Sequence, residues 1–177
     1  MSEAIARMGA EVHGVDMVAK NIQIARTHAA GQELKLVYEC CTAEQLADRG
    51  ELYDAVLNME VVEHVADLPL FMRSCAQVVR PGGVMMIATI NRTLASFFGA
   101  IIGAEYVLRW LPKGTHHWRK FPQPKELEEL LTANDLAVVE RKGVTVNPLT
   151  HQFRLTRYEG MNYVLVAVRS QVSANLT

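Results

Sequence analysis

Short apolar runs alternate with amphipathic stretches along the chain. Bounded apolar runs of about four to eight residues are typical of buried strands, and apolar residues that recur every three or four positions are typical of helices. The pattern predicts strands over residues 11–16, 34–38, 53–58, 84–90, 137–146 and 163–169. It predicts helices over 2–8, 18–30, 67–79 and 124–131, and a shorter one that begins at Thr42, where Gln45 completes a capping box. Strands that alternate with helices indicate an α/β fold with a mainly parallel sheet.

The stretch Tyr53–Asp67, YDAVLNMEVVEHVAD, carries the most chemistry. Its apolar run Ala55–Leu57 predicts a buried strand, and open α/β sheets bind ligands beyond the carboxyl ends of such strands. Three polar side chains follow that end: Glu60, Glu63 and His64. If residues 60–65 are helical, these side chains share one face and suit a divalent cation. The alternative is an acidic first turn of a helix beside a solvated histidine.

A second acid, Asp16, ends the strand predicted over residues 11–16. An acid at the end of the second strand of a nucleotide-binding sheet can accept hydrogen bonds from both ribose hydroxyls. The alternative is a capping role for the helix that begins near Val18. Both roles can coexist in one carboxylate.

Composition narrows the class of protein. A length of 177 residues is enough for one domain with a sizeable core, and 50% hydrophobic with 21% charged residues is ordinary for a soluble globular protein. A net charge of -1 gives no reason to expect a nucleic-acid partner. The three cysteines show no disulfide framework or zinc spacing, so a reducing compartment is expected. The first residues do not have the pattern of a secretory signal.

Several segments together resemble the Class I S-adenosylmethionine-dependent methyltransferases, and more narrowly the ubiquinone biosynthesis O-methyltransferases. The segments are GVDM (14–17), MEVVEH (59–64), VRPGG (79–83), ATINRT (88–93), GAEYVLRWLPKGTHHW (103–118) and NP (147–148). GVDM and RPGG occur in many methyltransferases, whereas MEVVEH combined with PKGTH is much more specific. The resemblance covers nearly all of residues 3–169. It implies a Rossmann-like sheet with helices on both faces, forming a single domain over residues 1–170 with a frayed tail over 171–177.

The resemblance also implies a reaction and roles for individual residues. The enzyme would transfer a methyl group from S-adenosylmethionine to one hydroxyl of a polyprenylated catechol in ubiquinone biosynthesis. Asp16 would bind the ribose of S-adenosylmethionine, and Met59 would lie against its adenosyl moiety. A divalent cation, usually magnesium in this family, would be held by Glu60, Glu63 and His64. The candidates for a general base, on chemistry alone, are His116 and His117.

One part of the family pattern is absent from this sequence. The family begins with a strand and a glycine-rich loop, whereas the only glycines before residue 30 are Gly9 and Gly14. In the family that strand lies between the strand that ends at Asp16 and the strand at Tyr53. We therefore predict an N-terminally truncated methyltransferase whose first central strand is missing, through a natural truncation or an incomplete gene model. The two flanking strands should lose partners or be forced together.

Residues 91–123 predict a lid or a membrane-contacting insertion. The uncharged run 94–104 is too short to span a bilayer. Both tryptophans lie within Leu94–Lys120, and between residues 91 and 125 six basic residues accompany one acid, Glu105. Apolar and aromatic residues beside basic ones suit an anionic membrane surface, and a two-helix lid over the substrate is the alternative. We expect a cytoplasmic protein peripheral to the inner membrane of a bacterium, or one on the matrix side of a mitochondrion.

Two other classes of function stay open at this level. A nicotinamide-dependent oxidoreductase would also use an acid at Asp16, although the sequence has no Tyr-x-x-x-Lys pair and no glycine-rich fingerprint. A catalytically impaired chain could instead act only as a membrane-associated component of a quinone-synthesis assembly. In that case its partners would be other ubiquinone-biosynthesis proteins.

Overall fold

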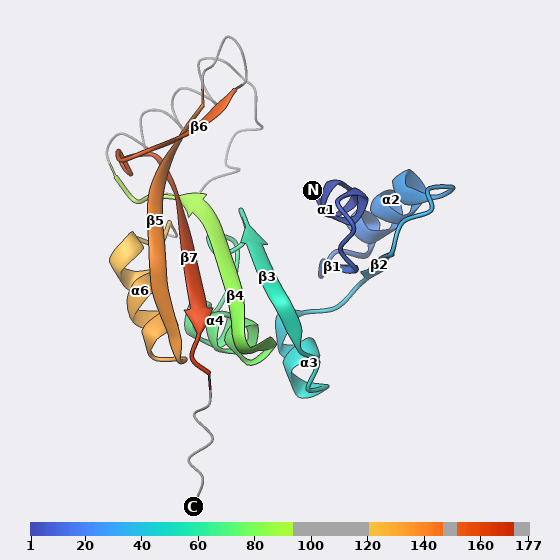
Figure 1. The fold of residues 1–177 in the computed structure, drawn as a ribbon, viewed down its shortest axis with the longest axis horizontal. Coiled ribbons are helices and arrows are strands. Elements are labelled where there is room, and N and C mark those ends of the chain that lie inside the picture. The colour runs from blue at the N-terminus through green and yellow to red at the C-terminus, as the bar shows by residue number, and fades with distance from the viewer. Residues whose placement is uncertain (94–120, 147–151, 172–177) are drawn as a thin grey trace, which may run out of the picture. The chain divides into compact units, whose positions relative to one another are not determined.

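The computed structural model describes residues 1–93, 121–146 and 152–171 (Figure 1). The chain divides into two compact units, residues 1–49 and residues 50–177. Each unit has its own sheet, and each is described by itself below. The segments 94–120, 147–151 and 172–177 lie outside the described residues. They include most of the predicted insertion 91–123 and most of the predicted tail.

The first unit is a short parallel pair of strands with three helices. Its elements are α1 (Ser2–Arg7), β1 (Val12–Val15), α2 (Ala19–Ala29), β2 (Leu36–Glu39) and α3 (Ala43–Asp48). β1 and β2 are parallel, as the pattern predicted. The predicted capping box is confirmed, because Thr42 Oγ1 accepts from Gln45 N at 3.3 Å and Gln45 Oε1 accepts from Thr42 N at 3.0 Å. The apolar core is small: Ala6, Ile22, Cys41 and Leu46.

The second unit holds a five-stranded sheet. Its elements are β3 (Tyr53–Met59), α4 (Leu68–Gln77), β4 (Val79–Ile90), α6 (Pro124–Thr132), β5 (Leu136–Val146), β6 (Phe153–Thr156) and β7 (Asn162–Arg169). The strand order is β3-β4-β7-β5-β6. Only β3 and β4 are parallel, and the other neighbours are antiparallel. This sheet is therefore mixed rather than mainly parallel. β6 follows its neighbour β5 after residues 147–152 alone, and so short a link can join neighbouring strands only when they are antiparallel.

Two helices cover one face of this sheet. α4 and α6 contact each other, α4 contacts β4, and α6 contacts β5 (Figure 1). The alternation of β4 is regular, with Met85, Ile87 and Thr89 fully buried and the residues between them only half-buried. α4 begins at Asp67, whose Oδ1 accepts from Leu70 N at 2.9 Å. Burial of β4 side chains under two amphipathic helices forms the main core of the chain.

The RPGG segment interrupts the pairing of β3 with β4. Tyr53 pairs with Val79, but the next pair is Ala55 with Val84, so the residues between them loop out. Gly82 has a φ of 76°, which favours glycine. A Cβ on Gly83 would lie 2.9 Å from Arg80 O and 3.0 Å from Asp54 O. The two glycines therefore let β4 bend against β3 without a clash.

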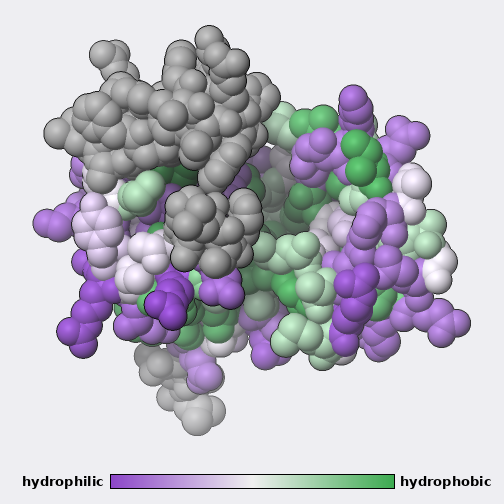
Figure 2. Space-filling model, turned by 90° about the horizontal axis from the view of Figure 1, so that it is seen from above, coloured by the Kyte–Doolittle hydropathy of each residue, from purple (hydrophilic) through white to green (hydrophobic). Residues whose placement is uncertain are grey.

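β1 and β3 each lie at the edge of their own sheet. In the described part of the chain β1 pairs only with β2, and β3 pairs only with β4. Among the described residues the two strands thus belong to separate sheets. Large apolar side chains are exposed in both units (Figure 2), among them Met8, Val37, Leu57 and Phe153. No helix among the described residues is long and apolar enough to cross a bilayer.

Candidate functional site

The segment after β3 is a turn. His64 N donates to Val61 O at 2.9 Å, and regular helix begins only at Leu68. Glu60 has a φ of 56°, in the left-handed region that a right-handed helix cannot use. Glu60 N also donates to Ala88 O at 2.8 Å, which continues the pairing of β3 with β4 by one residue. The helical arrangement considered for residues 60–65 is therefore wrong.

The structure nevertheless brings the two carboxylates together. Glu63 is 3% exposed, and its Oε2 accepts a hydrogen bond from Thr89 Oγ1 at 2.6 Å. Its Oε1 is buried and has no hydrogen-bond partner among the described atoms. The carboxyl group of Glu60 lies beside that of Glu63, and Glu60 is exposed to solvent. Glu63 is thus a buried acid with one oxygen held and one unsatisfied.

The electrostatics of the pair favour a proton or a cation between the carboxyl groups. The pKa of Glu60 is raised to about 8, first by desolvation and then by the charge of Glu63. Two carboxylates this close cannot both ionise cheaply unless a positive charge joins them. A positive φ at a non-glycine residue is a backbone strain of the kind found at functional sites. Glu60 combines that strain with a raised pKa.

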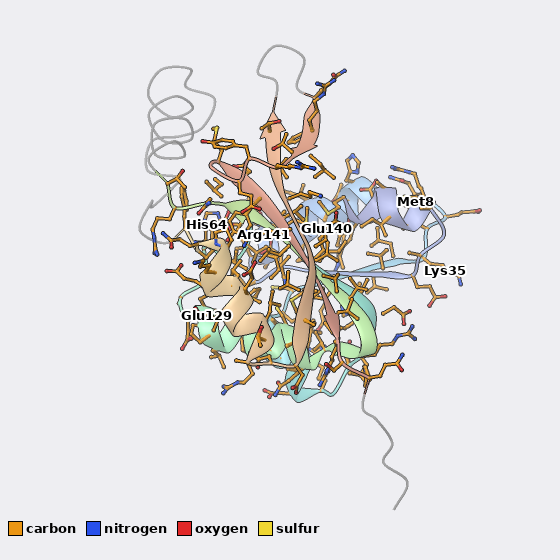
Figure 3. All side chains as sticks on the ribbon, turned by 60° about the vertical axis from the view of Figure 1, so that its left-hand side comes forward. Met8, Lys35, His64, Glu129, Glu140 and Arg141 are labelled. Carbon is orange, nitrogen blue, oxygen red and sulfur yellow. The ribbon has the colours of Figure 1, made fainter. Side chains whose placement is uncertain are left out.

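The third predicted ligand does not join the carboxylates. His64 is exposed (Figure 3). No group of three or more histidine, cysteine or acidic side chains in residues 1–93, 121–146 and 152–171 is arranged to hold a metal ion. The interpretation of Glu60, Glu63 and His64 as a preformed triad therefore reduces in this structure to a pair of carboxylates.

Asp16 orders the turn before α2 but is not the N-cap of that helix, which is Val18. Its Oδ1 accepts from Val18 N at 2.7 Å, and its Oδ2 accepts from Asn21 Nδ2 at 2.9 Å. These bonds hold the turn that leads from β1 into α2. Each carboxylate oxygen can accept a second hydrogen bond, so a ribose could still bind. Met59, the other predicted cofactor contact, is the half-buried last residue of β3 and precedes Glu60 directly.

Two predicted residues, His116 and His117, and one residue that the sequence did not single out, Thr89, remain to be placed. His116 and His117 lie outside the described residues. Thr89 is part of the ATINRT segment, but the sequence analysis gave this residue no role of its own. The signal that could have found it is the alternation of β4, where Thr89 is the one polar residue in the buried series that begins with Met85 and Ile87.

A family model for a methyltransferase domain matches residues 1–87. Solved structures of similar fold include the magnesium protoporphyrin IX methyltransferase of Synechocystis with bound SAH, with a TM-score of 0.64, 20% identity and coverage of 96% of this chain and 68% of that one. Another was solved in work on the conversion of a disulfide bond into a thioacetal group during echinomycin biosynthesis, with a TM-score of 0.70, 20% identity and coverage of 97% and 71%. The solved structures show that the chain has the fold of these proteins, and the model match over residues 1–87 is to a methyltransferase domain.

Curated relatives make the assignment narrower. The ubiquinone biosynthesis O-methyltransferase of Sinorhizobium fredii is 55% identical over 169 residues, which are 96% of this chain and 68% of the relative. The enzyme of the same name from Brucella ovis is 51% identical over 169 residues, with the same coverage. The chain belongs to the ubiquinone biosynthesis O-methyltransferase family. It spans about two thirds of the length of these relatives, and the family match favours methyl transfer over nicotinamide chemistry.

Proposed function

We propose that this chain carries the catalytic face of an enzyme that methylates one hydroxyl of a polyprenylated catechol in ubiquinone biosynthesis, with S-adenosylmethionine as methyl donor. The observation that carries the proposal is the pair of neighbouring carboxyl groups of Glu60 and Glu63 at the carboxyl end of β3, with a left-handed φ at Glu60. Ligands of open α/β sheets bind at this end of the strands. A buried carboxylate oxygen without a partner is a group that awaits a cation or a donor.

In the reaction, the catechol oxygen attacks the sulfonium methyl carbon, the S–CH₃ bond breaks, S-adenosylhomocysteine leaves and the hydroxyl proton is released. Alignment of two reactants can lower the barrier by about 7–11 kcal/mol, so the main task of the protein is to bind and orient them. We assign the ribose to Asp16 and the adenosyl moiety to Met59. The hydrogen bonds that Asp16 accepts from Val18 N and Asn21 Nδ2 support this role, because they fix the direction of its carboxylate. His116 and His117 stay candidates for the general base.

The carboxyl pair fits a divalent cation, most simply Mg²⁺. Magnesium usually binds one or two protein carboxylates and completes its shell with water and substrate oxygens. Glu63 offers its unsatisfied Oε1, and Glu60 is a second acid beside it. His64, the third residue of the predicted set, would have to move or act from outside the pair. A cation bound there would stabilise the catecholate and lower the pKa of its hydroxyl.

The proposal is tested by methyl transfer from labelled S-adenosylmethionine to a short-chain prenyl catechol. The protein would carry the glycine-rich segment of a relative joined before Met1, so that the whole cofactor site is present. Glu60→Gln should abolish the stimulation by Mg²⁺ and leave S-adenosylmethionine binding intact. Glu129→Gln, an exposed position on α6, is the matched control. Full activity in EDTA would contradict the metal role, and absence of catechol methylation in the unmutated protein would contradict the proposed function.

Contact with an anionic membrane surface through Leu94–Lys120 is a further part of the proposal, because the prenyl tail must be drawn from lipid. That segment lies outside the described residues. The described strand β6 supports the idea, since Phe153 and Leu155 are exposed and lie next to the basic Arg154. Such a protein would sit at the cytoplasmic face of the inner membrane, with other ubiquinone-biosynthesis proteins as partners. Failure of the chain to float with anionic liposomes would contradict this part.

A further inference from the structure

We propose that Thr89 is a positioning residue that aims the Glu63 carboxylate at a divalent cation. The inference rests on the proposed function, because it concerns the same carboxyl pair. It adds a residue from a different strand, β4, to a set that the sequence drew only from residues 59–64. The geometry that supports it is the contact between the Thr89 hydroxyl and one of the two Glu63 oxygens.

The hydroxyl of Thr89 is held rigidly. Thr89 is 0% exposed and lies on β4, where it pairs with Tyr163 of β7. Tyr163 is itself fully buried, and its hydroxyl donates to Pro122 O at 2.8 Å. A β-branched side chain in a packed strand has few rotamers available. The direction of the Thr89 Oγ1 is therefore set by the sheet, and Glu63 adapts to it.

The contact makes the two oxygens of Glu63 inequivalent. Oε2 accepts a hydrogen bond from Thr89 Oγ1 at 2.6 Å. Oε1 is buried without a partner among the described atoms. A carboxylate tethered at one oxygen presents the other in a fixed direction. Such an arrangement lowers the entropic cost of binding a cation, as hydrogen bonds to metal ligands generally do.

The alternative is that the contact between Thr89 and Glu63 serves only the stability of the fold. In that reading Thr89 only satisfies a buried acid, and its hydroxyl matters to folding alone. The two readings differ in what happens to cation affinity in a chain that stays folded. Glu60, Glu63 and Thr89 all lie in residues 50–177, so cation binding can be measured without the glycine-rich segment.

The experiment titrates the 177-residue chain with Mn²⁺ as the probe, followed by electron paramagnetic resonance, with thermal unfolding recorded in parallel. Thr89→Val keeps the shape of the side chain and removes the hydroxyl, and it should weaken Mn²⁺ binding about 10-fold to 100-fold. Thr89→Ser keeps the hydroxyl and should restore affinity to within about 3-fold, because only the methyl group is lost. Thr145→Val removes a hydroxyl from β5 and should leave Mn²⁺ affinity unchanged. In a Glu63→Gln background, Thr89→Val should have no further effect on Mn²⁺ affinity.

Each outcome decides between the readings. Wild-type Mn²⁺ affinity in a folded Thr89→Val chain, or no rescue by serine, would overturn the positioning role and leave the proposed metal site standing. Absence of Mn²⁺ binding by the unmutated chain would overturn both. Thr89→Ala provides a second deletion of the hydroxyl if valine prevents folding. If neither variant folds while serine does, the hydroxyl is structural and the positioning role is wrong.

Discussion

Replacement of Glu60 by glutamine should stabilise the protein at alkaline pH. The pKa of Glu60 is raised from 4.5 to about 8, chiefly by desolvation and by the charge of Glu63. Between these two values the folded chain keeps the proton while the unfolded chain has released it. The stability that Glu60 contributes is therefore fully present below pH 4.5 and is lost as the pH rises to 8. Glutamine imitates the protonated acid at every pH, so this loss should disappear in Glu60→Gln.

The size of the effect follows from the same two values. The difference between 4.5 and about 8 sets an upper limit of about 5 kcal/mol, at about 1.4 kcal/mol for each tenfold change in proton affinity. Glu60 is exposed to solvent. Solvent screening reduces such a value strongly, and we expect about 1–2 kcal/mol at pH 8. For a chain of this size that corresponds to an increase in Tm of about 2–8 °C.

The assay is urea unfolding followed by circular dichroism at pH 4.5, 6 and 8 in EDTA. The unfolding free energy of Glu60→Gln should exceed that of the unmutated chain by an amount that grows with pH and vanishes near pH 4.5. Glu129→Gln, exposed on α6, serves as the control and should show no such growth. Added Mg²⁺ should narrow the gap, because a cation stabilises the ionised pair. Parallel pH curves for wild type and Glu60→Gln would refute the assignment of a raised pKa to Glu60.

Three further predictions concern the frame of the site and the chain as a whole. Gly83→Ala should lower the unfolding free energy by about 1–3 kcal/mol, because its Cβ would meet the backbone oxygens of Arg80 and Asp54. An unchanged free energy in urea unfolding would show that the irregular pairing of β3 with β4 can relax. Arg169→Leu should lower the unfolding free energy by about 1.5–3 kcal/mol, since the Arg169 guanidinium donates to the carbonyl oxygens of Ala76, Gln77 and Val79 at the end of α4. The rate of amide hydrogen exchange in α4 should rise in this variant. The 177-residue chain, which has no glycine-rich strand and loop, should bind S-adenosylmethionine poorly yet float with anionic liposomes; micromolar affinity in calorimetry would show that the loop is dispensable.

The spacing of residues along the chain predicted part of the candidate site. The sequence named Glu60 and Glu63, and the structure brings them together, but by a turn whose shape depends on distant residues. The backbone bond from Glu60 N to Ala88 O and the left-handed φ of Glu60 both follow from the pairing of β3 with β4. Helical periodicity around Glu60 cannot reveal that pairing. The roles proposed for Asp16, Met59 and His64 stay predictions, since each still needs a bound ligand to test it.

Local chemistry alone determined most elements of this protein. Strands and helices were predicted from alternation and capping, as at Thr42 and Gln45, because these signals lie within a few residues of the element that they form. The short strand β6, Phe153–Thr156, was missed, since it is defined by its pairing with β5 rather than by a buried apolar run of its own. Only the tertiary structure decided the mixed order of the second sheet, the division of β1 and β3 between two sheets, and the bond between Glu63 and Thr89. Those two residues are 26 positions apart, and only the register of neighbouring strands and burial under α4 and α6 could bring them within 2.6 Å.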